Sequence, residues 1–338
     1  MGFVANYVRN LASLAACRTP RRPLLFSYYL THRCPLACRY CSDGQGRPFK
    51  EDLVDELPTG PARELIGLLR RSCDTLDITG GEPMLRPDLE DLLSHARQVG
   101  FRTVLNTKGT GLPQRPDVMR FSDVLVLSVD SLQPGRLAGI IGGAPEAAAG
   151  ILEALHWAIE NRRRHKTQVV LSAVAMPDTL DDVSKVLRFA VRHELMFQLS
   201  PQVVGTEVHP GLRDNERFRS LVEEAIAAKA RGAGVLGVAR YLRGIRDGRP
   251  YACHPLLMPT VRPDGAVNLP CLERPRERVR LDAAGRYDKV LTRARIARAS
   301  ARDCRGKCHI FCHMALSLLQ RHPLEALREL RAWRSPSC

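Results

Sequence analysis

The stretch PLLFSYYLTHRCPLACRYC, residues 23–41, joins an apolar, β-rich segment directly to a loop with three cysteines. Cys34, Cys38 and Cys41 have the spacing C-x3-C-x2-C. A structural zinc site or iron–sulfur cubane takes four protein ligands, so three thiolates leave one corner of a metal centre open. Zinc would fill that corner with water, whereas an iron–sulfur cluster can bind a substrate or cofactor there. The loop therefore predicts a metal centre whose chemistry depends on the rest of the sequence.

Apolar, β-rich runs alternate with amphipathic helical patterns along the first two thirds of the chain. After the run at 23–31, further runs occupy residues 75–79, 101–107, 124–130, 167–176 and 196–204. Apolar strands between amphipathic helices are typical of a parallel sheet that is covered on both faces. The pattern predicts an α/β fold, a partial (β/α)6 TIM-like barrel over residues 23–230. Functional groups of such barrels lie on loops after the strands' carboxyl ends, and the three-cysteine loop falls on that face.

The composition restricts the class of protein. The chain has 338 residues, 44% of them hydrophobic, and a formal charge of +15. No run of roughly eighteen apolar residues predicts a transmembrane helix, and the first residues lack the pattern of a signal peptide. The 11 cysteines are an odd number, which argues against a disulfide framework and for metal or redox chemistry in a reducing compartment. We therefore expect a cytoplasmic protein.

The three-cysteine loop and a second motif together resemble those of the radical S-adenosylmethionine (radical SAM) enzymes. In that family the cysteine loop follows the first strand of a βα barrel, and a GGEP motif follows the second. Here TGGEP, residues 79–83, follows the second predicted strand. The resemblance implies that Gly80, Gly81, Glu82 and Pro83 bind SAM, with glycine where the backbone must approach its methionyl amino group closely.

Weaker matches extend the resemblance to the other strands. Tyr40 precedes the third cysteine, where the family often has an aromatic residue near the adenine of SAM. Asn106 lies in LNTKG, which resembles the family's third-strand segment apart from an inserted Thr-Lys. Ser128 and Asp130 lie in LSVDS, which resembles the fourth-strand segment that reaches SAM, and QLSPQ (198–202) lies where the sixth strand lines the adenine pocket. As strand-end residues, Asn106, Ser128 and Asp130 also fit caps and turns.

The resemblance implies two cofactors, a [4Fe–4S] cluster on Cys34, Cys38 and Cys41, and SAM on its open iron. One electron from the reduced cluster would cleave SAM to a 5′-deoxyadenosyl radical, which would abstract a hydrogen atom from an organic substrate. The barrel would orient the reacting atoms and exclude water. The motifs name no catalytic residue for the substrate step. The competing interpretation is a zinc- or cluster-stabilised binding protein that uses a basic face for an anionic partner.

A second group of cysteines lies in a small domain predicted at residues 231–320. Cys253 and Cys271 flank a predicted hairpin that turns at Pro263-Asp264-Gly265. The segment RPDGAVNLPC resembles the SPASM and twitch extensions of radical SAM enzymes, which hold auxiliary [4Fe–4S] clusters, although its Gly-to-Cys spacing is one residue longer than usual. Three more cysteines follow in DCRGKCHIFCHM: Cys304, Cys308 and Cys312.

The resemblance to these extensions implies one auxiliary [4Fe–4S] cluster, because five cysteines are fewer than the seven of the two-cluster pattern. We expect the core ligands to be Cys253, Cys271, Cys304 and Cys308, with Cys312 a fourth or spare ligand. A helix that begins near Cys308 would place Cys308 and Cys312 on one face. A structural zinc site with the same ligands is the alternative. His309 and His313 share this spacing, and we interpret them as exposed histidines rather than ligands.

Both ends of the chain have amphipathic patterns. Residues 1–22 predict a helix with an apolar face of Phe3, Val4, Tyr7, Val8, Leu11 and Leu14. This helix would pack under the barrel or, because arginines accompany it, lie at a membrane interface. A final amphipathic helix is expected over residues 313–333, and residues 321–338 make up the C-terminal helix and tail.

A basic stretch occupies residues 274–307, with twelve basic and four acidic residues. It could bind an anionic substrate, an acidic electron donor such as flavodoxin or ferredoxin, or an anionic membrane surface. Nucleic acid is not expected as a partner, since aromatic residues are sparse there and no nucleic-acid-binding motif is present. A solvated, arginine-rich surface is the simpler alternative.

Two features that are missing from the sequence restrict the possible reactions, but no motif identifies the substrate. We expect no N-terminal peptide-recognition module, because only about thirty residues precede the cysteine loop. No cobalamin-binding signature is present, so cobalamin-dependent methylation is not expected. Dehydrogenation, carbon–carbon or carbon–sulfur bond formation, and adenosyl or alkyl transfer remain. The substrate would be a small metabolite, a lipid precursor or a short peptide, and the auxiliary cluster would transfer electrons or bind it.

Overall fold

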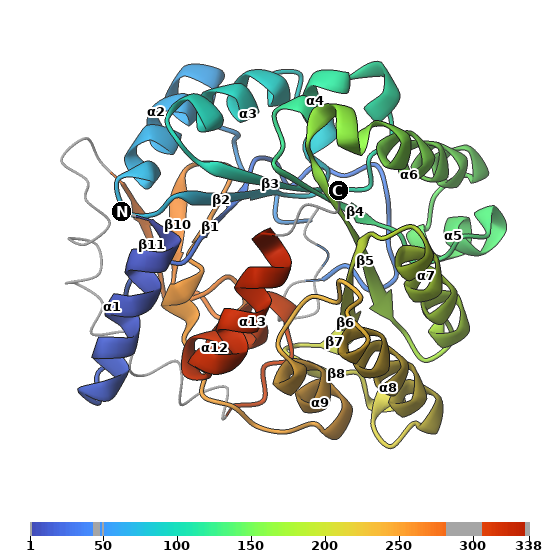
Figure 1. Cartoon of the computed structure of the whole chain (residues 1–338). Coiled ribbons are helices and arrows are strands. Elements are labelled where there is room, and N and C mark those ends of the chain that lie inside the picture. Colours follow the sequence, from blue (N-terminus) through green and yellow to red (C-terminus); the bar gives the residue numbers. More distant parts are fainter. Residues whose placement is uncertain (1, 43–47, 49–50, 282–305, 335–338) are drawn as a thin grey trace.

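The computed structural model describes residues 2–42, 48, 51–281 and 306–334 (Figure 1). Its main feature is a nine-stranded sheet with the order β11-β10-β9-β1-β2-β3-β4-β5-β6. The six strands from β1 to β6 follow chain order, and each neighbouring pair is parallel. This confirms the predicted α/β fold. The six are β1 (Phe26–Tyr29), β2 (Thr75–Thr79), β3 (Arg102–Thr107), β4 (Val124–Ser128), β5 (Gln168–Ala175) and β6 (Met196–Pro201).

Helices cover the convex outer face of this curved sheet (Figure 1). They lie between successive strands in the sequence, as the amphipathic patterns predict. A two-stranded hairpin, β7 (Val203–Val204) with β8 (Glu207–Val208), follows β6. The helices are α2 (Thr59–Arg70), α3 (Leu89–Gln98), α4 (Pro116–Arg120), α5 (Pro134–Ile141), α6 (Pro145–His165), α7 (Leu180–Arg192), α8 (Glu216–Ala230) and α9 (Ala239–Asp247).

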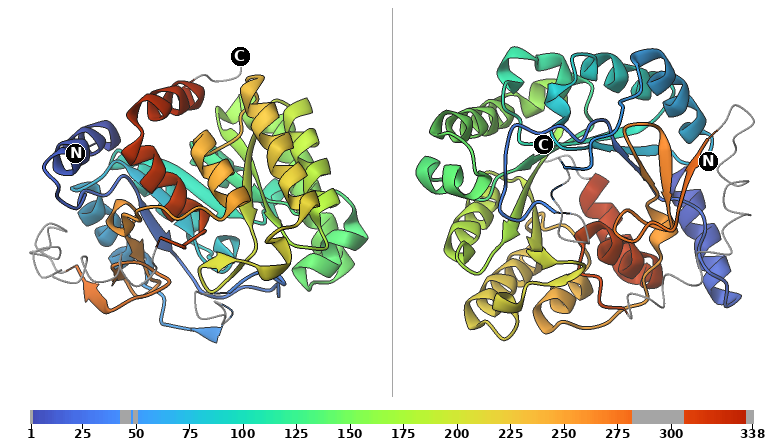
Figure 2. Two further views of the ribbon diagram at one scale, coloured as in Figure 1. Left: turned by 90° about the horizontal axis from the view of Figure 1, so that it is seen from below. Right: turned by 180° about the vertical axis from the view of Figure 1, so that it is seen from behind.

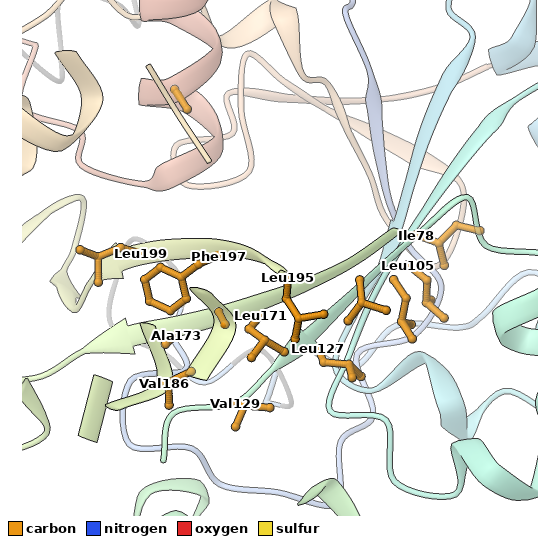
Figure 3. Packing of buried hydrophobic residues seen from close by; sticks show 14 of the residues in the cluster. Ile78, Leu105, Leu127, Val129, Leu171, Ala173, Val186, Leu195, Phe197 and Leu199 are labelled. Atoms are coloured by element: carbon orange, nitrogen blue, oxygen red, sulfur yellow. The ribbon is translucent and has the colours of Figure 1, made fainter. Parts of the chain in front are cut away.

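The main hydrophobic core lies between the outer face of the sheet and these helices. Ile78, Leu105, Leu127, Leu171 and Phe197 come from five successive strands and are fully buried there (Figure 3). Because side chains alternate along a strand, the residues between them point to the inner, concave face. The sequence of the same strands therefore determines both the core and the interior of the barrel.

The C-terminal region extends the barrel sheet by three strands. They are β9 (Thr260–Val261), β10 (Ala266–Leu269) and β11 (Glu277–Arg280). β9 pairs with β1 in parallel, and β10 pairs with β9 in the antiparallel sense. The predicted turn at Pro263-Asp264-Gly265 is confirmed, and Gly265 has the positive φ of 80° that favours glycine.

Two helices, rather than the single one predicted over residues 313–333, follow. They are α12 (Phe311–Arg321) and α13 (Pro323–Arg334). Pro323 causes the break, because proline lacks an N–H and starts a helix better than it continues one. α12 lies within the curve of the sheet, and α13 continues from it at one end of the barrel (Figures 1 and 2). The structure therefore closes the open side of the partial barrel with α12.

The N-terminal helix α1 (Phe3–Ala15) packs beside α12 on part of the predicted apolar face, through Phe3, Tyr7 and Leu11. Tyr7 is buried, whereas Val4 and Val8 are 50% and 57% exposed. Asn6 and Asn10 are buried instead, because their amide groups donate to backbone carbonyls of Pro23, Ser72 and Arg22. Hydrophobic periodicity missed this, since hydrogen bonds from the amide nitrogens lower the cost of burying an asparagine.

No single helix in the described parts of the chain has the length and apolar character to cross a membrane. Only α5 and α6 taken together, bent by 113°, meet the same criteria.

Candidate active site

The start of the three-cysteine loop is held against the TGGEP segment. The Gly81 amide donates to the Thr31 carbonyl over 2.7 Å, and the Glu82 amide donates to the Arg33 carbonyl over 2.9 Å. A Cβ on Gly81 would lie 2.2 Å from the Arg33 carbonyl oxygen, and one on Gly80 would lie 2.4 Å from that of Thr31. We expected SAM to require these glycines. The structure shows a steric requirement within the chain itself.

The middle of the loop is held from the other side by the end of α5. The Ala37 and Arg39 amides donate to the carbonyls of Ile141 and Ile140 over 2.9 and 3.1 Å. The guanidinium of Arg39 also forms a two-fold ion pair with Asp178. Backbone contacts on both flanks thus fix the segment that carries Cys34, Cys38 and Cys41, before any ligand is considered.

The three thiols of the loop differ in how exposed they are. Cys34 and Cys38 are partly buried and Cys41 is exposed. Burial raises the pKa of the Cys38 thiol, and the nearby Lys108 ammonium opposes that rise. Among the described residues, no three Cys, His, Asp or Glu side chains surround a position for a single metal ion. A four-iron cluster places each thiolate on a different iron, so the donor set and the fixed loop fit it.

Tyr40, Ser128 and Asp130 converge beside this loop. The Tyr40 hydroxyl donates to the Asp130 carboxylate over 2.7 Å and lies 3.5 Å from the Ser128 hydroxyl. Lys108, which the sequence analysis treated only as part of an insertion, donates to Tyr40 and Asp130 over 2.9 Å each. Burial alone would lower the pKa of Lys108, but Asp130, Tyr40 and Cys38 together hold it well above its usual value. The lysine is therefore a charged part of the site.

Lys108→Met is expected to destabilise the fold by about 3–5 kcal/mol, because it leaves the Asp130 carboxylate buried without its cation. Asp130 is fully buried and the Lys108 side chain is 9% exposed. Urea unfolding at pH 7.5 measures the effect. The double variant Lys108→Met/Asp130→Asn should recover part of the loss, and Arg217→Met, in the exposed pair with Asp181, should change little. Equal losses in the single and double variants would contradict a coupled pair.

Glu82 is buried, and its carboxylate binds groups of the surrounding chain. Its carboxylate accepts hydrogen bonds from the amides of Met84 and Lys108 and from the Thr107 hydroxyl. Burial raises the pKa of Glu82, and these hydrogen bonds oppose the rise. Pro83 begins the short 3-10 helix Pro83–Leu85 that follows. The expected SAM-binding motif thus also joins the end of β2 to the end of β3.

Asn106 points into the barrel and contacts the carboxylate of Asp77, a residue that no sequence motif indicated. Its amide nitrogen donates to Asp77, and the Ser27 hydroxyl donates to the same carboxylate over 2.9 Å. All three line a cavity of about 1070 Å³ that fills the interior of the barrel. Burial raises the pKa of Asp77 to about 6, which the two hydrogen bonds only partly oppose. The alternation of TLDIT, with Asp77 between two buried apolar residues, was the available signal.

Asp77→Asn is expected to stabilise the protein at pH 8 by on the order of 3 kcal/mol and to have no such effect at pH 4. The raised pKa means that Asp77 favours folding only while it is protonated. That contribution is lost as the pH rises from about 4 through about 6. Urea unfolding at both pH values tests this, with Asp181→Asn, at an exposed carboxylate, as the control. A variant that is less stable than wild type at pH 8 would show that the anion is stabilised.

Two of the five C-terminal cysteines lie together. Cys253 and Cys308 both lie beside the Tyr251 hydroxyl; burial raises the pKa of this tyrosine, and both thiols raise it further. The Tyr251 amide donates to the Gly306 carbonyl over 3.0 Å, so the segments that carry these cysteines run side by side. Cys271 is buried at the end of β10. Cys304 lies outside the described residues.

Cys312 lies elsewhere, in the first turn of α12, and lines the barrel cavity. The predicted helix start near Cys308 is wrong, because α12 begins at Phe311, so Cys308 and Cys312 do not share a helical face. Burial raises the pKa of Cys312 to about 12, with a further rise from Asp77. His309 and His313 are buried, not exposed as we expected.

Comparison with known proteins places this geometry in a family. Residues 28–190 match the family model described as the radical SAM superfamily. PqqA peptide cyclase of Ruegeria pomeroyi is 34% identical over 175 residues, which are 50% of this chain and 44% of the relative. PqqA peptide cyclase of Rhizobium meliloti is 32% identical over 181 residues, with the same coverage of 50% and 44%. The chain thus spans less than half the length of these relatives.

Solved structures support the fold. SuiB of Streptococcus suis, bound to SAM, superposes with a TM-score of 0.59 and 16% identity, over 81% of this chain and 66% of that one. The anSMEcpe structure with AdoMet and the Cp18Cys peptide has a TM-score of 0.58 and 16% identity, over 91% and 97% of the two chains. At this identity the similarity concerns architecture alone.

The predicted resemblance and the fold class are thereby confirmed, and the cofactors that the resemblance implies, a [4Fe–4S] cluster and SAM, are those of the matched family. The matched region contains the three-cysteine loop, the GGEP motif and the Tyr40–Lys108–Asp130 contacts. Residues 28–190 of this chain are a radical SAM domain.

Proposed function

We propose that the chain is an enzyme that reductively cleaves SAM and abstracts a hydrogen atom from an organic substrate in the barrel cavity. The observation that carries the proposal is the three-cysteine loop, fixed by Gly81 on one side and by Ile140 and Ile141 on the other. Cys34, Cys38 and Cys41 would hold a [4Fe–4S] cluster. When bound, the cluster and SAM supply the one-electron cleavage that yields the 5′-deoxyadenosyl radical.

The residues of the chain orient and enclose the reactants. Tyr40, Ser128 and Asp130 would bind SAM beside the loop, and Lys108 holds two of them in place. Gly80, Gly81, Glu82 and Pro83 join that site to the loop. α12 lies on the open side of the sheet and lines the cavity, so it would help to enclose the substrate where it reacts.

An auxiliary [4Fe–4S] cluster is part of the proposal. Cys253 and Cys308 lie together, and Cys271 and Cys304 would complete its ligands. If the substrate loses two electrons in the reaction, a cluster held by four thiolates would accept the second of them. The basic residues of 274–307 would favour flavodoxin or ferredoxin as an electron donor. We place the enzyme in the cytoplasm, with an anionic membrane surface as a further partner of its basic residues.

The reaction is tested by anaerobic reconstitution with iron and sulfide, followed by reduction in the presence of SAM. We expect 5′-deoxyadenosine and about eight irons per chain, from two four-iron clusters. A protein that binds zinc in both sites and leaves SAM intact would instead be a metal-stabilised binding protein.

Cys308→Ala is expected to halve the iron content to about four, whereas Cys312→Ala should keep about eight. The reason is their separation: Cys308 lies with Cys253 beside Tyr251, and Cys312 lines the barrel cavity. Iron analysis and electron paramagnetic resonance of reconstituted protein measure this. If Cys312→Ala lost four irons, Cys312 would be a ligand of the auxiliary cluster.

The curated relatives suggest peptides as one substrate class, since two of them are named PqqA peptide cyclases. One SuiB structure, similar in fold at a TM-score of 0.58, is bound to its precursor peptide SuiA. Because this chain spans less than half of the curated relatives, its own substrate is better inferred from its cavity.

A further inference from the structure

We infer that the barrel cavity binds a long alkyl or isoprenoid chain, so that the substrate is a lipid-like amphiphile rather than a peptide. The inference rests on the proposed function for its chemistry, but it concerns binding alone. It follows from the side chains that point to the inner face of the sheet and from the helix α1 at the cavity's edge.

One wall of the cavity is apolar. Val104, Val126 and Val170 come from β3, β4 and β5, and Leu236 and Phe311 pack with them in a cluster separate from the main core. All five line the cavity. In a closed eight-stranded TIM barrel the interior is filled by such side chains. Here about 1070 Å³ remains, at the upper end of the sizes of ligand sites, and an apolar occupant would stabilise it.

The apolar surface continues to the edge of the cavity at α1. Leu316 and Leu319 of α12 and Phe3 of α1 belong to one apolar cluster, and all three line the cavity. Val4 and Val8 line it as well, yet they are 50% and 57% exposed. Exposed apolar residues at the edge of an apolar cavity are expected where an alkyl chain passes from a membrane or carrier into the protein.

The other wall is polar and leads toward the cysteine loop. Ser27 and Asp77 are cross-strand neighbours on β1 and β2, and Tyr29 lies close enough to Asp77, Glu273 and Cys41 to interact electrostatically with each. An amphiphile would therefore place its polar end near this wall, on the side of the cavity toward Cys41, and its chain along the apolar wall.

A peptide would fit the apolar wall poorly. Each residue of an extended peptide brings an N–H and a C=O that need hydrogen-bond partners when they are buried. The side chains of Val104, Val126 and Val170 offer none. Their backbone groups belong to strands that already pair on both sides, β3 with β2 and β4, and β4 with β5. An alkyl chain has no such requirement.

The test uses the full chain without reductant or SAM, so it does not depend on turnover. The probe is cis-parinaric acid, a fluorescent fatty acid, displaced by saturated fatty acids of increasing length below their micellar concentrations. We expect one site, with affinity rising about fourfold for each buried CH2, the fold-change that corresponds to ~0.8 kcal/mol.

Two variants locate the site. Val170→Trp fills the cavity and should weaken probe binding at least about tenfold, whereas Val191→Trp, on the 40% exposed Val191 of α7, should bind as wild type does. Val4→Glu keeps the exposed position and suits a helix N-terminus, so it should fold normally and still weaken binding several-fold.

Three results would overturn the inference: affinity that does not depend on chain length, unchanged binding in both Val170→Trp and Val4→Glu, or full displacement of the probe by an unrelated hydrophilic peptide. Any of these in protein that cleaves SAM after reconstitution would reject the substrate class and leave the proposed reaction standing. Chain-length-dependent binding in protein that does not cleave SAM would support the substrate class and reject the proposed reaction.

Discussion

Replacing Cys34, Cys38 or Cys41 with alanine is expected to reduce 5′-deoxyadenosine formation from SAM to background. Each thiol lies on the one loop whose backbone is fixed by both TGGEP and the end of α5. With two thiolates left, the loop would no longer hold three irons of a four-iron cluster, and that cluster would supply the electron that cleaves SAM. The measurement is 5′-deoxyadenosine after anaerobic reconstitution and reduction.

The control is Cys17→Ala, because Cys17 is exposed after the end of α1 and lies far from the loop in sequence. It should retain wild-type SAM cleavage. Circular dichroism should show that the loop variants keep the barrel, since the three thiols are at most partly buried and do not belong to the buried core. SAM cleavage that persists in any one of the three variants would remove that cysteine from the ligand set and the assignment with it.

The order and direction of the barrel strands were predictable, because they depend on features that a sequence displays directly. Apolar runs such as VLVLS and the amphipathic segments between them determine a parallel sheet, and the loop after the first strand must lie at its carboxyl edge. The alternation of side chains along each strand also determines the inner face of the barrel. A run of mostly apolar residues does not reveal which side chains lie on that face. Asp77 lies between the buried Leu76 and Ile78, and only the folded structure shows that it lines a cavity.

Other features depend on long-range partners and could not be predicted from local patterns. Lys108 pairs with Asp130, 22 residues away, so in the sequence it looked like an insertion in LNTKG. Asn6 and Asn10 are buried where their amide nitrogens donate to the carbonyls of Ser72 and Arg22, which lie on other segments of the chain. Cys308 and Cys312 were grouped by their spacing. However, α12 begins only at Phe311, so Cys312 lies in its first turn and lines the barrel cavity. In each case a tertiary contact overrides a local rule.

Gly81→Ala is expected to reduce SAM cleavage more than any other change predicted here outside the cysteines. The added Cβ would lie 2.2 Å from the carbonyl oxygen of Arg33 and 2.6 Å from that of His32, and both obstacles are backbone atoms that cannot rotate away. The loop must therefore move, and Cys34 follows Arg33 directly. We expect a loss of about 3 kcal/mol in the free energy of unfolding and a fall of about 100-fold in SAM cleavage, since displacement of reacting groups by about 1 Å has that effect.

Gly139→Ala is the matched control for this change. Gly139 lies in α5, the helix whose last residues hold the other flank of the loop, but a Cβ there would meet no atom within 4 Å. Alanine also favours a helix over glycine by about 1 kcal/mol, so this variant should be as stable as wild type or more so, with full SAM cleavage. If Gly81→Ala retained both stability and SAM cleavage, close packing of TGGEP against residues 32 and 33 would not position the cluster loop. Contact with SAM would then be the better reason for glycine at that position.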